Sequence, residues 1–172
     1  MWCYENDKNN KIRYILGEKG DHPLFCIGIN PSTAEPNSLD PTVHRVKQMS
    51  IRNNFDGWFM LNVYPQRSTN PDKIQKSCND EIHNKNIFFI NNYLKKYDKP
   101  IIWAAWGTLI EKRKYMIECL KDIYEKNKNC NTCWINFGSL TKKGHPRHPL
   151  YLSYSSEKNY FDIKNYIKKN QI

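Results

Sequence analysis

Four short apolar runs, separated by longer segments, constrain the fold of this chain more than any other feature of its sequence. They are residues 24–29, 58–64, 101–106 and 133–137, and each is followed by a polar residue, a proline or a glycine. Continuous apolar runs of this length are typical of strands that are buried on both faces of a sheet. We therefore expect four buried strands.

The segments between the runs carry helix signals. Asp40 followed by Pro41 predicts the N-cap and first residue of a helix that runs to about Asn53. Apolar residues at helical spacing predict three more helices, a long or broken one over 71–96, one over 108–125 and a last one over 156–169.

Strands that alternate with helices favour a three-layer α/β/α fold with a central, mostly parallel, four-stranded sheet. The length of 172 residues fits a single domain over residues 1–172. No apolar run approaches membrane-spanning length, and the first residues lack the pattern of an export signal. We expect a cytoplasmic monomer that does not contact a membrane, with its six cysteines as reduced thiols.

The charge of the chain is strongly positive and unevenly distributed. The net charge is +10, and no acidic residue lies between Glu125 and Glu157. Lys142, Lys143 and Arg147 fall in this acid-free stretch and could bind a phosphate backbone. A lysine-rich composition throughout the chain is the alternative explanation. We expect DNA as the partner.

Polar residues cluster where the predicted strands end. Asn30 and Ser32 follow the first run, Asn62 and Arg67 lie at the end of the second, and a basic loop containing His148 follows the fourth. Ligands of parallel α/β sheets bind beyond the carboxyl ends of the strands. These residues are therefore expected to surround one site, with Arg67 among the DNA-backbone contacts.

Four of these strand ends resemble motifs of the uracil-DNA glycosylase superfamily. The segments are Gly28-Ile29-Asn30-Pro31, Leu61-Asn62, the run 102–107 that closes in Trp106-Gly107, and His148-Pro149-Leu150. The asparagine in the first motif is similar to that of the mismatch-specific branch. Ser32 and the order Arg147-His148-Pro149 depart from the superfamily pattern.

The resemblance implies a uracil-DNA glycosylase-like fold and a role for each motif. Asn30 would position the attacking water, Asn62 would read the edge of a flipped base, and His148 would contact a carbonyl of that base. Ser32 is expected to contribute to the base pocket. Tyr64 and then Trp106 are the candidates for stacking on the base, and Tyr151 also lies beside motif residues.

A second resemblance covers nearly the whole chain. The pattern Asn-Pro-Ser-x-Ala at 30–34, Asp-Pro-Thr at 40–42, Asn-x-x-x-x-Arg at 62–67 and Gly-x-Pro-Arg-His-Pro-Leu at 144–150 is similar to domain-of-unknown-function family 1643. This resemblance identifies a family and no reaction.

The chemistry of N-glycosidic bond cleavage fits these residue types. A carboxamide at Asn30 can orient water, and an imidazole at His148 can donate a hydrogen bond to the oxyanion that develops on the leaving base. Asp40 could activate the water instead, although helix capping already accounts for it. His145 and His148 are conceivable metal ligands, but no further ligand lies nearby in the sequence, so we expect neither metal nor cofactor.

The expected function is therefore a DNA glycosylase-like enzyme that removes a modified or mismatched base, in repair or in defence against phage DNA. Two alternatives remain open. One is a base-binding module that has lost hydrolysis, and the other is an enzyme that acts on free nucleosides or nucleotides.

Overall fold

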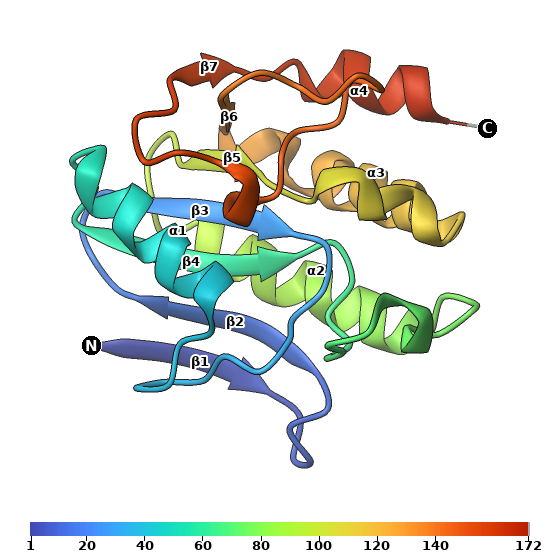
Figure 1. Ribbon diagram of the computed structural model, residues 1–172. Coiled ribbons are helices and arrows are strands. Elements are labelled where there is room, and N and C mark those ends of the chain that lie inside the picture. The colour runs from blue at the N-terminus through green and yellow to red at the C-terminus, as the bar shows by residue number, and fades with distance from the viewer. Residues whose placement is uncertain (172) are drawn as a thin grey trace.

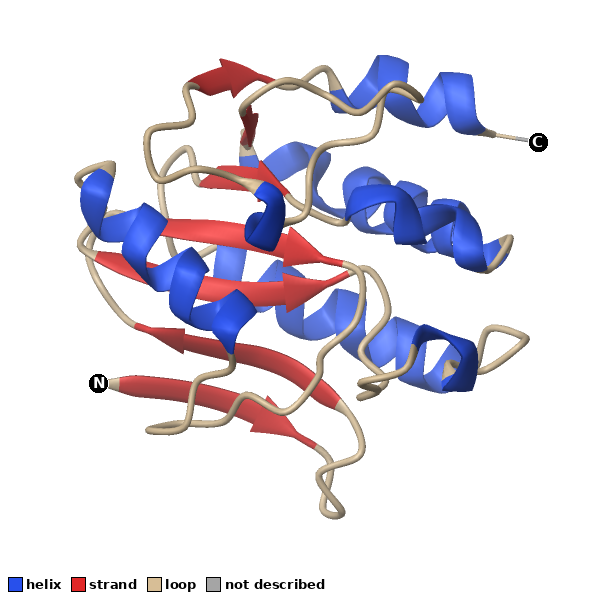
Figure 2. Ribbon diagram, viewed as in Figure 1, coloured by secondary structure: helices blue, strands red, loops and turns tan. Residues whose placement is uncertain are grey.

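The computed structural model describes residues 1–171 and contains one seven-stranded mixed sheet with helices on both faces (Figures 1 and 2). The order of strands across the sheet is β1-β2-β4-β3-β5-β6-β7. The strands are β1 Trp2–Asn6, β2 Arg13–Glu18, β3 Pro23–Gly28, β4 Gly57–Asn62, β5 Ile101–Ala104, β6 Cys133–Phe137 and β7 Lys158–Tyr160.

The four predicted strands form the centre of the sheet as β4-β3-β5-β6, and all of them run parallel. The prediction of four strands in total is wrong, because β2 pairs with β4, β1 with β2, and β7 with β6, each antiparallel. These three strands lack a continuous apolar run. β1 and β7 are edge strands, which need fewer apolar side chains, and in β2 the apolar residues Tyr14-Ile15-Leu16 are flanked by Arg13 and Gly17-Glu18, so the sequence signals are weaker.

Four α-helices flank the sheet, and short 3₁₀ turns connect several elements. The helices are α1 Pro41–Arg52, α2 Asp80–Leu94, α3 Tyr115–Asn127 and α4 Ile163–Asn170. The 3₁₀ turns are η1 Pro71–Lys73, η2 Gly107–Lys112, η3 Lys128–Cys130 and η4 Pro149–Tyr151. Within residues 1–171, no helix is both long and apolar enough to cross a membrane.

Helix α1 follows the sequence prediction closely, and the side chain of Asp40 accepts a hydrogen bond from the Val43 N–H, as an N-cap does. The helix predicted over 71–96 as long or broken is broken, because η1 and α2 are separated by residues 74–79. The helix predicted over 156–169 is wrong in its first half. Residues 158–160 form β7, and α4 begins after Asp162, whose side chain caps it.

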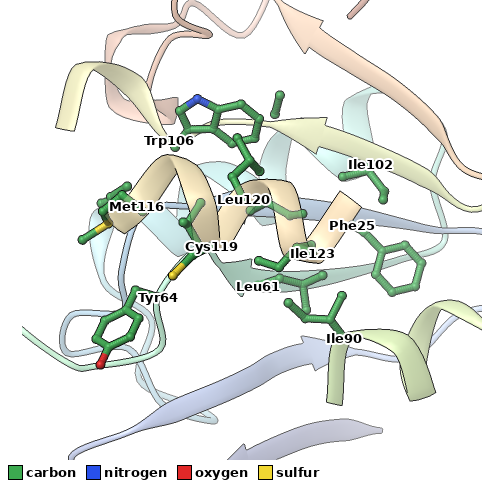
Figure 3. Packing of buried hydrophobic residues seen from close by; sticks show 14 of the residues in the cluster. Phe25, Leu61, Tyr64, Ile90, Ile102, Trp106, Met116, Cys119, Leu120 and Ile123 are labelled. Carbon is green, nitrogen blue, oxygen red and sulfur yellow. The ribbon is translucent and has the colours of Figure 1, made fainter. Parts of the chain in front are cut away.

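The sheet separates two apolar cores. Helix α1 packs Val43, Val46 and Met49 against Trp58 and Met60 of β4 on one face. The larger core lies on the other face, beneath α2 and α3 (Figure 3). Because side chains of a strand alternate between the two faces, the parity of a residue decides which core it joins. In β4, this alternation places Asn62 on the α1 face together with Trp58 and Met60.

Candidate functional site at the carboxyl ends of the parallel strands

A cavity of about 200 Å³ lies at the carboxyl ends of β3 and β4, beside the N-terminus of α1. Four predicted site residues line it together, Asn30, Ser32, Asp40 and His148. We call it the strand-end cavity. Residues 30 and 148 are far apart in the chain, so the fold brings these residues into one place, as the topology rule for parallel sheets predicts.

A second cavity, of about 460 Å³, lies next to the first, and we call it the Tyr151 cavity. Its lining residues are Trp106, Gly107, Thr108, Leu109, Thr141, Arg147, His148, Leu150 and Tyr151. His148 and Leu109 line both cavities. His148 therefore stands in the wall between two adjoining spaces.

The carboxamide of Asn30 is held in one orientation. Its Nδ2 donates to the carbonyl oxygens of Pro31 and Ser68, at 2.9 and 3.0 Å. Its Oδ1 accepts no hydrogen bond from the residues that the structure describes. These contacts fix the loops that follow β3 and β4, and they leave the side chain with one available acceptor at the cavity.

The imidazole of His148 is also oriented by the backbone. The Leu150 N–H donates to its Nδ1 at 3.3 Å, so the neutral ring carries its proton on Nε2. Burial lowers the pKa of His148 below the usual value of 6.5, and the charge of Asp40 opposes that shift. The ring is therefore neutral at pH 7 and has a free N–H donor at Nε2.

Gly107 explains why a glycine ends the third apolar run. Its φ is +64°, a conformation that L side chains rarely adopt, and an added Cβ would lie 3.3 Å from the Cβ of His148. The exit of β5 thus packs directly against the histidine. Two motifs from distant parts of the sequence contact each other here.

Asp40 lines the strand-end cavity, and both of its carboxylate oxygens are engaged. Oδ1 accepts the Val43 N–H at 2.9 Å and Oδ2 accepts the Ala34 N–H at 3.3 Å. These bonds anchor the N-terminus of α1 to the loop that follows β3. The capping role expected from the sequence is present, and it already uses the carboxylate.

Arg13 is a site residue that sequence reasoning missed. It begins β2, lines the strand-end cavity and is only 1% exposed. Its Nη1 donates to the Ala34 carbonyl oxygen at 3.1 Å, and its Nε has no partner. The available signal was an arginine at the start of the apolar segment Arg13-Tyr14-Ile15-Leu16.

Asn62 lies on the same face of the sheet as the strand-end cavity, but it is not among the residues that line this cavity. It follows Met60 by two residues in β4 and points to the α1 side. Its Oδ1 lies 3.4 Å from the position that a Cβ on Gly28 would take. The side chain is fully buried, and neither Nδ2 nor Oδ1 has a hydrogen-bond partner. A ligand could reach it only after a local movement.

The two rings predicted to stack on a base lie in the larger core, on the other face of the sheet (Figure 3). Tyr64 and Trp106 are both 0% exposed, and Trp106 Nε1 donates to the Tyr166 hydroxyl at 3.0 Å. Neither side chain is accessible at the surface, although Trp106 also lines the Tyr151 cavity. Tyr151 is accessible, since it is 79% exposed, and it contacts the His148 ring edge-on, with the ring centroids 6.1 Å apart.

The predicted DNA-backbone residues separate into two groups. Lys142 and Lys143 are exposed, and Lys143 forms an ion pair with Glu111 at 2.7 Å. Arg147 is half-buried, and its Nε donates to the Ser139 carbonyl oxygen at 2.9 Å. Arg67 is different, because it points inward and its guanidinium bonds the hydroxyl of Tyr4 and the Ala34 carbonyl. Arg67 therefore joins segments of the protein to one another and does not extend from the surface toward a DNA backbone.

Among residues 1–171, no group of three or more His, Cys, Asp or Glu side chains is arranged to hold a metal ion. His145 and His148 bond different partners, since His145 contacts Tyr166 and Glu111. The polar residues that line the strand-end cavity therefore supply an amide, an imidazole, hydroxyls, a buried guanidinium and the carboxylate of Asp40.

Comparison with curated proteins found no match, and comparison with solved structures found none either. The resemblance to uracil-DNA glycosylases therefore rests on the motifs alone. A family model described as "Protein of unknown function (DUF1643)" matches residues 13–150. That span begins at Arg13 and ends two residues after His148, so it includes the whole strand-end cavity lining. Because the match covers most of the chain, this protein belongs to the DUF1643 family.

Proposed function

We propose that this protein is a DNA glycosylase-like hydrolase with a uracil-DNA glycosylase-like arrangement of its site, which cleaves the N-glycosidic bond of a flipped modified or mismatched base. One observation carries the proposal. Asn30 and His148 line one cavity, and backbone contacts hold each side chain so that an acceptor, Oδ1, and a donor, Nε2–H, remain available.

The two adjoining cavities support a division of roles. The base would enter the Tyr151 cavity and stack on Tyr151, and the sugar would lie at the wall formed by His148. Asn30 Oδ1 would accept a hydrogen bond from a water in the strand-end cavity. The water oxygen bonds to C1′ and loses one proton to solvent as the C1′–N bond breaks, and the base leaves with the bonding electrons and takes up a proton from solvent.

The neutral state of His148 suits this chemistry. A neutral imidazole that donates from Nε2 can stabilise negative charge developing on a carbonyl oxygen of the base. Burial keeps the pKa of His148 low, which maintains the neutral form at pH 7. Asn62 would then contribute only if the cavity wall opens on binding, because its carboxamide is enclosed.

DNA as the substrate is supported by charge. Arg147 lines the Tyr151 cavity, and both it and the exposed Lys142 lie in the acid-free stretch. Basic side chains beside a base pocket would contact the phosphates that flank a flipped nucleotide.

A base-binding module without hydrolysis is the second candidate, and one observation favours it. Asp40 is the one carboxylate that lines the strand-end cavity, and backbone N–H groups occupy both of its oxygens. Each oxygen thus already accepts one hydrogen bond that anchors α1, which makes Asp40 a weaker general base and favours binding over hydrolysis.

Incubation with duplexes that contain uracil, mismatched thymine or hypermodified pyrimidines tests the proposal. Formation of alkali-sensitive abasic sites on at least one duplex supports the hydrolase. Salt-sensitive binding without abasic sites supports the binding module, and turnover of free nucleosides with no duplex cleavage supports a small-molecule enzyme. His44→Ala and Asn84→Ala, which change exposed residues away from both cavities, serve as matched controls for His148→Ala and Asn30→Ala.

A further inference from the structure

Arg13 is a buried cation that the proposed reaction does not use. It is 1% exposed, its Nε has no hydrogen-bond partner, and its Nη2 bonds no atom of residues 1–171. Among the described residues, the one hydrogen bond of its side chain goes to the neutral carbonyl of Ala34. Buried charges in proteins are normally paired with an opposite charge, because an uncompensated one is costly.

The surroundings of Arg13 do not supply that compensation. Burial, together with the neighbouring guanidinium of Arg67, lowers the pKa of Arg13 to about 10, and Asp40 opposes the shift. Arg67 itself pairs with Glu35, at 3.7 Å. Asp40 makes no ion pair with Arg13 and directs its oxygens to the backbone N–H groups of Val43 and Ala34.

The cavity above Arg13 has the features of an anion site. Hydroxyl side chains from three segments line it, those of Ser32, Thr42, Ser68 and Thr69. The N-terminus of α1, a helix of 12 residues, opens into it, and the Thr42 N–H has no acceptor among the described residues. The N-terminus of a helix favours negative charge, and arginine is the side chain best suited to phosphate oxygens.

We propose that the Arg13 end of the strand-end cavity is a subsite for one phosphate group of a nucleotide or nucleic acid, bound by the guanidinium, the cavity hydroxyls and the first turn of α1. The volume of about 200 Å³ suits a single small group, since pockets for larger ligands begin at roughly 300 Å³. The subsite does not depend on hydrolysis, because a base-binding module would use the same phosphate contact.

The charge of Asp40 distinguishes between two sources of the phosphate group, a phosphodiester of a nucleic acid and the phosphate monoester of a free nucleotide. A phosphodiester carries one negative charge, whereas a phosphate monoester carries close to two at neutral pH. Repulsion from Asp40, which lines the same cavity, therefore favours the diester. We expect a dinucleotide to bind more tightly than a nucleoside monophosphate, and the reverse order would identify free nucleotides as the source.

Titrations of the intact chain followed by NMR test the subsite. The probes are inorganic phosphate, thymidylyl-thymidine, thymidine 5′-monophosphate and thymidine, at constant ionic strength. We expect the three phosphates, but not thymidine, to shift the Arg13 Nε–H and Thr42 N–H resonances. Shifts confined to exposed lysines, or no shift of either resonance, would overturn the proposal whether or not the protein releases bases.

Substitution gives an independent measurement. Arg13→Lys keeps the charge but loses the planar guanidinium, and it should weaken binding of the dinucleotide by on the order of tenfold or more. Lys142→Ala controls for general attraction, and it should weaken binding much less at high salt. Equal effects of the two variants would contradict the subsite. If Arg13→Lys does not fold, Thr42→Pro, which removes the N–H at the second position of α1, replaces it.

Discussion

A Cβ atom added at Gly107 would lie 3.3 Å from the Cβ of His148, which is closer than nearly all contacts of real Cβ atoms. The end of β5 thus determines how near the histidine can approach the sheet. Because His148 separates the two cavities, this contact also sets the shape of the proposed site.

Gly107→Ala is expected to lower stability and to displace His148. The φ of +64° costs a non-glycine residue about 1–2 kcal/mol, and the contact with His148 adds strain. Gly144→Ala is a matched control, because Gly144 has a φ of +83° and no atom within 4 Å of the added Cβ. Urea unfolding should show a loss for both variants, whereas base release should fall only in Gly107→Ala. Equal activity of the two variants would mean that the contact has no functional effect.

Asn30→Asp should destabilise the protein more than Asn30→Ala does. The Nδ2 of Asn30 faces three carbonyl oxygens, those of Pro31, Gln66 and Ser68, and a carboxylate would place an acceptor with negative charge against them. We expect Asn30→Ala to lose about 1–2 kcal/mol in urea unfolding at pH 7 and Asn30→Asp to lose more. If Asn30→Asp were as stable as the wild type, Nδ2 would not be the atom that faces the carbonyls.

The central strands, α1 and the convergence of Asn30, Ser32, Asp40 and His148 could be predicted because each depends on local signals. Asp40 followed by Pro41 specifies the start of a helix by itself, and the apolar runs specify buried parallel strands. The topology of a parallel sheet then brings the strand ends together.

The burial of Tyr64 and Trp106 could not be predicted from the sequence, for a definite reason. A strand that is buried on both faces has no alternation of polar and apolar residues, so its sequence does not reveal which face a side chain takes. Trp106 shares the parity of Ile102 and Ala104 and therefore joins the larger core. Arg13 was missed because its burial depends on segments distant in the sequence, since its N–H bonds the Pro65 carbonyl and its guanidinium bonds the Ala34 carbonyl.

The stability of the protein should decrease as the pH falls from about 7 through 6.5 toward the lowered pKa of His148. Burial lowers that pKa in the folded chain, so the unfolded chain binds more protons in this window. Protonation would also remove the acceptor for the Leu150 N–H. Urea unfolding at several pH values should show a flatter dependence for His148→Gln than for the wild type. Parallel curves would indicate that His148 is not desolvated.

Tyr166→Phe is expected to cost about 2 kcal/mol or more, because it breaks a buried chain of hydrogen bonds. Trp106 Nε1 donates to the Tyr166 oxygen at 3.0 Å, and the Tyr166 hydroxyl contacts His145 Nδ1 at 2.7 Å. The phenylalanine would leave both nitrogens buried without partners. Tyr160→Phe, at a residue that is 77% exposed, should leave the unfolding midpoint unchanged. A similar small effect of both variants would show that these buried hydrogen bonds contribute little to the stability of the protein.

Quantification of free base in single-turnover reactions tests the central claim most directly, with wild type, Asn30→Ala, His148→Ala and the double variant on the most reactive duplex. Hydrolysis at the shared cavity predicts one released base for each abasic site. It also predicts that each single variant slows release by about 10²–10³-fold, and that the double variant is slower by less than the product of the two effects. Wild-type protein that binds the duplexes and releases no base, or single variants that react at the wild-type rate, would contradict it.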